Sequence, residues 1–306
     1  MHSHRTISRR GLLGTGLALA TLPAAARAAS LEFLVVGDWG RGGADRQLEV
    51  GAQMGRTAAA IGSRFVVSVG DNFYEDGVTS PDDPQWDGSF EFIYSAPSLQ
   101  IPWHAILGNH DYIGNVQAQI DYSARSSRWR MPARYFQRRE HLSDGTPADF
   151  FYLDTNPFLR EYWGTKVRVD GQDTAAQLAW LDAALAMSDA PWKIVIGHHP
   201  VHTVARERRD TPELIARLKP LLRKHRVSIY LNGHDHNLQY TPIDGGHWIT
   251  SGAGSETNRV KKAEGDEFGT DQHGFMTVSL SAETFAFAFI NESGDKLFEK
   301  TLPRQG

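Results

Sequence analysis

The chain of 306 residues contains no cysteine. Without thiols it can form neither a disulfide framework nor a thiolate metal site, and a cysteine nucleophile is excluded as well. Any metal ion must therefore be bound by oxygen and imidazole ligands. The sequence has 13 histidines and 36 acidic residues that can supply them.

The sequence also has no excess of positive charge. The formal net charge is −4 for the whole sequence. The first 28 residues hold four arginines and no acidic residue, so the charge of the rest is close to −8. A mildly acidic chain has no basic surface for a phosphate backbone, and we expect no nucleic-acid partner.

The sequence also lacks a hydrophobic run that could comfortably span a bilayer. An apolar stretch over residues 11–22 is short and rich in glycine, and it follows Arg9 and Arg10. The small residues Ala26 and Ala28 complete the pattern of a cleaved export signal. The paired arginines indicate the twin-arginine route. We therefore expect residues 1–28 to be a signal peptide, and the protein to be periplasmic or secreted without stable membrane association.

Residues 29–306 are expected to form a single domain, because no repeat or long linker divides them. Strand-like runs alternate with amphipathic helical patterns until the last third, which contains strand patterns without helices between them. This order predicts an α/β (α+β) fold with a βαβ half and an antiparallel half, as a two-sheet β-sandwich flanked by helices. The expected helices cover residues 45–61, 115–125, 173–187 and 211–224, and the expected late strands cover 247–251, 274–279, 284–290 and 296–301.

Five short motifs place metal-binding side chains beside glycines, most of them directly after an apolar, strand-like run. Loops beyond the carboxyl ends of strands form the ligand crevice of open α/β sheets, so the five motifs are expected to converge on one site. Glycine permits the tight turns that direct each ligand inward. The motifs are GDWG at 37–40, GDNFY at 70–74, GNHD at 108–111, GHHP at 197–200 and GHDH at 233–236.

These motifs supply enough ligands for two adjacent metal ions. Two ions that share a carboxylate lie roughly 3.5–4 Å apart, the spacing of two-metal phosphoryl chemistry, and Asp71 is the best placed to be shared. His198 and His199 are neighbours that should point in different directions, and the motif position favours His198 as the ligand. The candidate ligands are the anionic oxygens of Asp38, Asp71 and Tyr74, the amide oxygen of Asn109, and the imidazoles of His198, His234 and His236.

The set of motifs resembles the calcineurin-like metallophosphoesterases and, within them, the purple acid phosphatases of the small tartrate-resistant type. Most metallophosphoesterases carry Asp-x-His in the first motif, whereas this chain has Asp38, Trp39 and Gly40 there and Tyr74 three residues after Asp71. That exchange of a histidine for a tyrosinate distinguishes the purple acid phosphatases. The similarity extends to GDNFYEDGV, LGNHDYIGNVQAQIDYS, NGHDHNLQY and SGAG, and it implies the four-layer αββα architecture.

The resemblance implies one Fe(3+) ion and one divalent ion, Zn, Fe or Mn, in each subunit. Hard anionic oxygens suit the ferric ion, and the imidazole and amide ligands suit a softer divalent ion. The implied activity is that of a monomeric acid phosphatase, which hydrolyses monoesters of small phosphorylated substrates through attack of a metal-bound hydroxide at a dinuclear Fe(III)–M(II) centre. The implied ferric ligands are Asp38, Asp71, Tyr74 and His236, and the implied divalent-ion ligands are Asp71, Asn109, His198 and His234.

The resemblance also assigns catalytic roles in the GNHD motif. It places His110 beside the leaving oxygen, where an imidazolium can donate a proton. Asp111 is expected either to orient His110 or to act as a helix cap. Both residues are therefore candidates for the catalytic site.

The chain departs from the family pattern at Glu207. Related small acid phosphatases have a second active-site histidine nine residues after the ligand that corresponds to His198, and this chain has a carboxylate there. A carboxylate cannot be the same cationic partner for phosphate. Either His202 or Arg206 substitutes for the missing histidine, or the substrate preference differs. His202 and Glu207 are therefore the candidate substrate-binding residues.

Two other functions remain open for the sequence. The first is an exported metallophosphodiesterase acting on nucleotide or lipid diesters. The second is a non-catalytic phosphate-binding or iron-binding protein, whose signature would be the loss of His110 or Asn109. Both residues are present.

Overall fold

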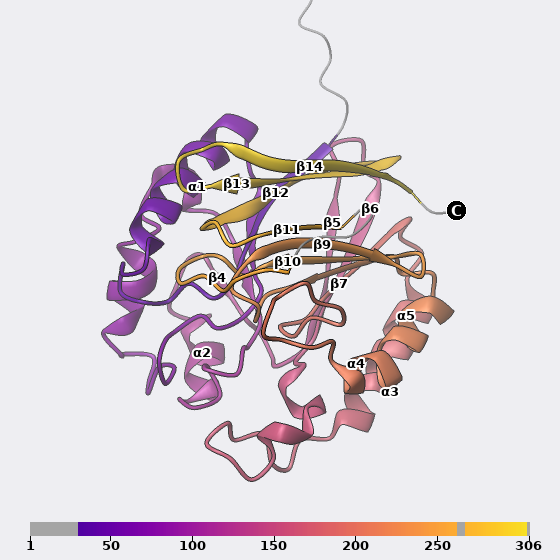
Figure 1. Cartoon of the computed structure of the whole chain (residues 1–306), viewed down its shortest axis with the longest axis horizontal. Helices are drawn as coiled ribbons and strands as arrows, with labels where there is room; N and C mark the ends of the chain where they lie inside the picture. The colour runs from indigo at the N-terminus through magenta and orange to yellow at the C-terminus, as the bar shows by residue number, and fades with distance from the viewer. Residues whose placement is uncertain (1–29, 262–266, 305–306) are drawn as a thin grey trace, which may run out of the picture.

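The computed structural model describes residues 30–261 and 267–304, and in it two β-sheets pack face to face between two layers of helices (Figure 1). The first sheet has the strand order β14 (Lys296–Pro303), β13 (Thr284–Asn291), β12 (Gly274–Ser281), β1 (Ser30–Val36), β2 (Phe65–Ser68), β3 (Trp103–Ala105) and β4 (Trp129–Arg130). The second sheet has the order β11 (Phe268–Thr270), β9 (Leu238–Ile243), β10 (Gly246–Ser251), β8 (Ile229–Asn232), β7 (Trp192–Ile196), β6 (Pro147–Tyr152) and β5 (Phe136–His141). The expected signal peptide lies outside the described residues.

The α-helices form the two outer layers (Figure 1). They are α1 (Gln47–Ile61) and α2 (Val116–Tyr122) beside the first sheet, and α3 (Thr174–Met187), α4 (Pro212–Arg217) and α5 (Lys219–Lys224) beside the second. Short turns of other helix types cover Trp86–Glu91, Pro97–Leu99, Asn156–Phe158 and Arg160–Tyr162. Among the residues described, no helix combines the length and the apolar character needed to cross a membrane.

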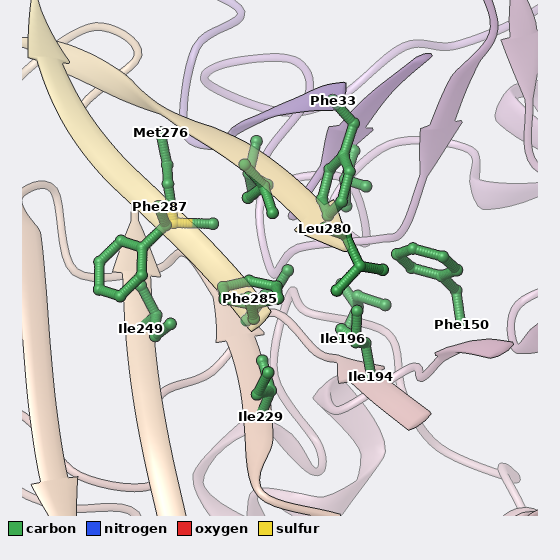
Figure 2. Close-up of a cluster of buried hydrophobic side chains, with 14 of the residues drawn as sticks. Phe33, Phe150, Ile194, Ile196, Ile229, Ile249, Met276, Leu280, Phe285 and Phe287 are labelled. Atoms are coloured by element: carbon green, nitrogen blue, oxygen red, sulfur yellow. The ribbon is translucent and has the colours of Figure 1, made fainter. Parts of the chain in front are cut away.

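Strand alternation produces separate cores on the two faces of each sheet. In β1, Phe33 and Val35 point between the sheets, whereas Leu34 and Val36 pack in the cluster that includes Met54 of α1. Figure 2 shows the inter-sheet core, where Phe33, Met276, Leu280, Phe285 and Phe287 of the first sheet face Phe150, Ile194, Ile196, Ile229 and Ile249 of the second. The predicted α/β sandwich flanked by helices is confirmed.

Two details differ from the sequence-based expectation. The single helix expected over residues 211–224 is divided at Leu218, because Pro220 has no N–H for a bond to the preceding turn. The late strands do not form a separate antiparallel half. β12 pairs antiparallel with β1 in the first sheet, and β10 pairs parallel with β8 in the second.

Candidate metal centre

All seven predicted ligands lie on loops that follow the carboxyl ends of adjacent parallel strands. In the first sheet these loops follow β1, β2 and β3, which pair in parallel. In the second sheet they follow β7 and β8, which also pair in parallel. The first sheet contributes Asp38, Asp71, Tyr74 and Asn109, and the second contributes His198, His234 and His236.

Three of these residues have a backbone conformation that is uncommon for side chains other than glycine. The φ angles are 59° for Asp38, 51° for Asp71 and 67° for His234, all in the left-handed region. Each such residue costs of order 1–3 kcal/mol and persists only where the surrounding structure fixes it. Their presence in one place indicates a functional site.

Two glycines are required because backbone and ligands approach closely. A Cβ atom at Gly108 would lie 2.1 Å from Oδ1 of Asp71. At Gly70, where φ is +94°, a Cβ atom would lie 2.6 Å from Nδ1 of His198. Any larger residue at either position would displace a candidate ligand.

The first group of ligand atoms surrounds the phenol of Tyr74. Its hydroxyl lies 3.2 Å from Oδ1 of Asp38, 3.0 Å from Oδ2 of Asp71 and 3.0 Å from Nε2 of His236. These are the four side chains implied for the ferric ion. The structure therefore brings three hard oxygen ligands and one imidazole together.

The second group surrounds the amide of Asn109. Its Oδ1 atom lies 3.3 Å from Nε2 of His198 and 3.0 Å from Nδ1 of His234. Asp71 lies between the two groups, because Oδ2 is 3.5 Å from Nε2 of His198 as well as 3.0 Å from the Tyr74 hydroxyl. The shared carboxylate is thus in the position that two adjacent ions require.

The electrostatics of the first group fit a cation. Burial, followed by the charges of Asp71 and Asp38, raises the pKa of Tyr74 well above its ordinary value. Burial also raises the pKa of Asp38, despite the opposing charge of His198. For Asp71, burial is outweighed by the charges and hydrogen bonds of His198 and His110, and its pKa falls below the usual range. A bound cation relieves the repulsion among these buried acidic groups, and the residues present therefore fit a metal pair.

His199 is close to this centre but has other partners. Its ligand atoms lie within 4.8 Å of those of His198 and His234. However, Nδ1 is 2.8 Å from the hydroxyl of Thr155 and Nε2 is 3.0 Å from that of Tyr162. His199 is therefore held as a buried, hydrogen-bonded residue, and His198 faces Asp71 and Asn109.

His110 presents its imidazole at the rim of the centre, with 26% of the side chain exposed. Its ring lies 4.4 Å from the ring of Tyr74, and its backbone N–H donates to Asp71 at 2.8 Å. Nδ1 is 2.6 Å from the carbonyl oxygen of Glu75, which can only accept, so the Nδ1 atom carries a hydrogen. The Nε2 atom remains available for a second proton.

Asp111 does not orient the His110 ring, contrary to one of the two expectations. Its buried carboxylate accepts from the backbone N–H groups of Asn72 at 3.1 Å and Gly108 at 2.8 Å, and from the side chain of Gln119 at 2.8 Å. These bonds tie the GDNFY loop to the GNHD loop. The sequence did not predict the bonds of Asp111 with Asn72 and Gln119. The only hint of them was that Asn72 lies inside the GDNFY motif.

His202 is not directed at the metal centre either. Its Nδ1 atom is 2.7 Å from Asp210 and its Nε2 atom is 2.8 Å from Nζ of Lys219. Its ring packs on Trp248 at 5.4 Å. Both ring nitrogens therefore have partners, and neither is free to bind a substrate phosphate.

Glu207 is exposed on the wall of a cavity of about 350 Å³ that extends to His234 and His199. The same cavity is lined by Arg208, whose Nη1 atom lies 3.1 Å from Nε2 of His234. Arg206 is exposed, and its backbone N–H donates to Arg259. Among Arg206 and Arg208, it is thus Arg208 that contacts a candidate ligand, and no motif of the sequence pointed to it.

A second arginine lies beside the Tyr74 ring. The guanidinium of Arg41 is 4.0 Å from the ring centroid and forms ion pairs with Glu75 at 2.6 Å and Glu256 at 2.7 Å. Its charge lowers the pKa of Tyr74 and opposes the effect of burial. Arg41 directly follows the GDWG motif, and this was the only feature of the sequence that indicated its place beside Tyr74.

Comparison with known proteins identifies the family. Residues 31–238 match the model of the calcineurin-like phosphoesterases. Purple acid phosphatase 7 of Arabidopsis thaliana is 38% identical over 290 residues, which are 90% of this chain and 87% of the relative. Tartrate-resistant acid phosphatase type 5 of Sus scrofa is 35% identical over 301 residues, covering 90% of this chain and 87% of the relative. The chain belongs to the purple acid phosphatases.

Purple acid phosphatases are metal-dependent phosphoric monoester hydrolases, and the family implies a dinuclear metal centre in this member. The fold is also that of the solved structure titled "GAP50 the anchor in the inner membrane complex of Plasmodium". The TM-score is 0.77 at 24% identity, and the match covers 91% of this chain and 90% of that one. The family predicted from the five motifs is confirmed.

Proposed function

We propose that this protein is an acid phosphatase that hydrolyses monoesters of small phosphorylated substrates at an Fe(III)–M(II) pair. The observation that supports this most directly is the position of Asp71, whose Oδ2 atom lies between the Tyr74 phenol and the His198 imidazole. A carboxylate shared by an oxygen-rich group and an imidazole-rich group suits a trivalent and a divalent ion side by side.

In this proposal the ions are held by side chains from both sheets. A bound pair supplies Lewis acidity, orients the phosphate and neutralises charge during in-line displacement at phosphorus. The ferric ion is assigned to Asp38, Asp71, Tyr74 and His236, and the divalent ion, Zn, Fe or Mn, to Asp71, Asn109, His198 and His234.

His110 is proposed as the proton donor to the leaving oxygen. The carbonyl of Glu75 holds Nδ1–H, so the transferred proton is the one on Nε2 of the imidazolium. The backbone N–H of His110 donates to the shared Asp71, which fixes the distance between the donor and the ligands. His110 thus both donates the proton and holds the shared ligand Asp71 in place.

The test combines metal analysis, the visible spectrum and two substrates. The iron-loaded, oxidised protein should be coloured through charge transfer from the Tyr74 phenolate, and Tyr74→Phe should remove most of that absorption. An aryl phosphate should be hydrolysed faster than its bis-aryl diester. A preference for the diester would favour the phosphodiesterase alternative, and metal binding without turnover of either ester would favour a binding protein.

We also propose that the protein is exported through the twin-arginine route. The residues concerned, 1–28, lie outside the described part of the chain, and the proposal rests on Arg9, Arg10 and the apolar stretch that follows them. Replacing both arginines with lysine should leave the precursor inside the cell. Normal export of that double variant would refute the route.

A further inference from the structure

Arg208 lies on the segment between β7 and α4 and reaches the metal centre from the side of the second ligand group. Its Nη1 atom is 3.1 Å from Nε2 of His234, and its Nε atom is 3.8 Å from Oδ1 of the buried Asp235. The side chain is 45% exposed. It therefore combines a contact with a candidate ligand and an open face toward solvent.

The space around Arg208 can accept a substrate. The side chain lines the cavity of about 350 Å³ that ends at His199 and His234, and also a neighbouring cavity of about 510 Å³ that is lined by Asn258 and Arg259. The guanidinium thus lines both cavities beside the candidate metal centre. A phosphorylated molecule in the first cavity, which His234 lines, would lie beside the guanidinium.

The contact between Arg208 and His234 depends on which imidazole nitrogen binds a metal ion. Nδ1 of His234 faces Asn109 at 3.0 Å, and Asn109 in turn faces His198, so the ligand nitrogen is Nδ1. A neutral imidazole that binds through Nδ1 carries its hydrogen on Nε2. Arg208 has only N–H donors, and Nε2–H cannot accept from it. The Nη1 donor of Arg208 is then left to an acceptor in the cavity, while its Nε atom stays near Asp235.

We propose that Arg208 binds a non-bridging phosphate oxygen of the substrate and so supplies the cationic contact that Glu207, nine residues after His198, cannot make. The inference rests on the proposed phosphatase function and deepens it. His202 is excluded because Asp210 and Lys219 occupy both of its nitrogens. Because the guanidinium is a cation with a fork of N–H donors, this contact favours dianionic monoesters over diesters.

The experiment uses the metal-loaded protein and inorganic phosphate, the product of the reaction, measured by isothermal titration calorimetry. Loss of a charge-assisted hydrogen bond to phosphate should weaken binding about ten- to a hundredfold in Arg208→Gln. Arg208→Lys should recover part of the affinity. The matched control is Arg209→Gln, because Arg209 is an exposed arginine that lines the same cavity.

Turnover provides a second measurement. Arg208→Gln should raise KM for an aryl phosphate more than for the bis-aryl diester, which carries one negative charge fewer. Phosphate affinity equal to that of the wild type with metal content intact would overturn the proposal. Loss of metal from Arg208→Gln, with normal phosphate affinity in the fraction that retains it, would show that Arg208 only supports His234 and would also overturn it. Phosphate binding without hydrolysis by the wild type would instead refute the phosphatase function.

Discussion

At the scale of single residues, His110 has one nitrogen fixed by the Glu75 carbonyl and the other free at the rim of the centre. A good leaving group such as a nitrophenolate departs without a proton, whereas an alkoxide needs one. General acid catalysis typically contributes about 10²–10⁴-fold. His110→Ala should therefore slow hydrolysis of alkyl phosphates by about that factor and of activated aryl phosphates much less.

The control for this variant is His141→Ala, because His141 is exposed at the end of β5. Metal content should be measured in both. Equal slowing of alkyl and aryl esters by His110→Ala, with both ions retained, would mean that His110 binds phosphate in the ground state as well as in the transition state. The proton would then have to come from another group.

The candidate ligands could be named from the sequence because five of the seven directly follow a glycine in a loop after a strand, and the other two, Tyr74 and His236, lie within three residues of Asp71 and His234. The roles of Asp111, His202 and Arg208 could not be predicted. Each depends on a partner far along the chain or on the rotation of one side chain, as with Asp111 and Gln119 or Arg208 and His234. A motif predicts which residues lie at the site, but it does not predict the side-chain orientation of the residues around them.

At the scale of elements, strands and helices with a clear period were predictable. The expected helix over 173–187 appears as α3 with the Asp173 side chain capping its start, since Asp173 accepts from the N–H of Ala176 at 2.9 Å. The sheet to which each late strand belongs was not predictable, because it depends on the distant partners of β10 and β12, which are β8 and β1.

Strand β3 carries a histidine into the inter-sheet core, and this predicts sensitivity to acid. Burial lowers the pKa of His104 to about 3, helped by the charges of Arg138 and Arg130. Glu140 lies 3.9 Å away and would favour the imidazolium, but Arg138 also binds that carboxylate. In the folded protein His104 is thus neutral. Because the unfolded chain takes up this proton more readily, the free energy of unfolding is highest above pH 6.5 and decreases as the pH falls from 6.5 toward 3.

The variant that tests this is His104→Phe, which should pack against Phe65 and Tyr152, the rings that His104 contacts. Protonation of His104 in the unfolded chain should reduce the free energy of unfolding by about 3 kcal/mol between pH 7 and pH 4. Urea unfolding at the two pH values should show a smaller loss for His104→Phe than for the wild type. An unchanged loss would place the acid sensitivity elsewhere, and exposed His141→Gln is the control.

At the scale of the whole molecule, the metal centre joins the two sheets. Asp38, Asp71, Tyr74 and Asn109 follow strands of the first sheet, and His198, His234 and His236 follow strands of the second. The contacts of the inter-sheet core are apolar and have no preferred direction (Figure 2). The candidate ligands, in contrast, contact one another across the two sheets through specific atoms. Bound ions should therefore act as cross-links between the sheets as well as in catalysis.

This arrangement predicts that removing the ions lowers the stability of both sheets together. A ligand present at 1,000 times its dissociation constant stabilises the folded state by about 4 kcal/mol, and 1 kcal/mol corresponds to roughly 2–4 °C in domains of comparable size. Chelation should thus lower the melting temperature by roughly 10 °C, with recovery on adding Fe(3+) together with a divalent ion (Zn, Fe or Mn). His236→Ala should show a smaller chelation effect, because one of the links between the sheets is already missing. A melting temperature that stays the same after both ions are lost would mean that the apolar core alone holds the sheets together and that the ions serve only the reaction.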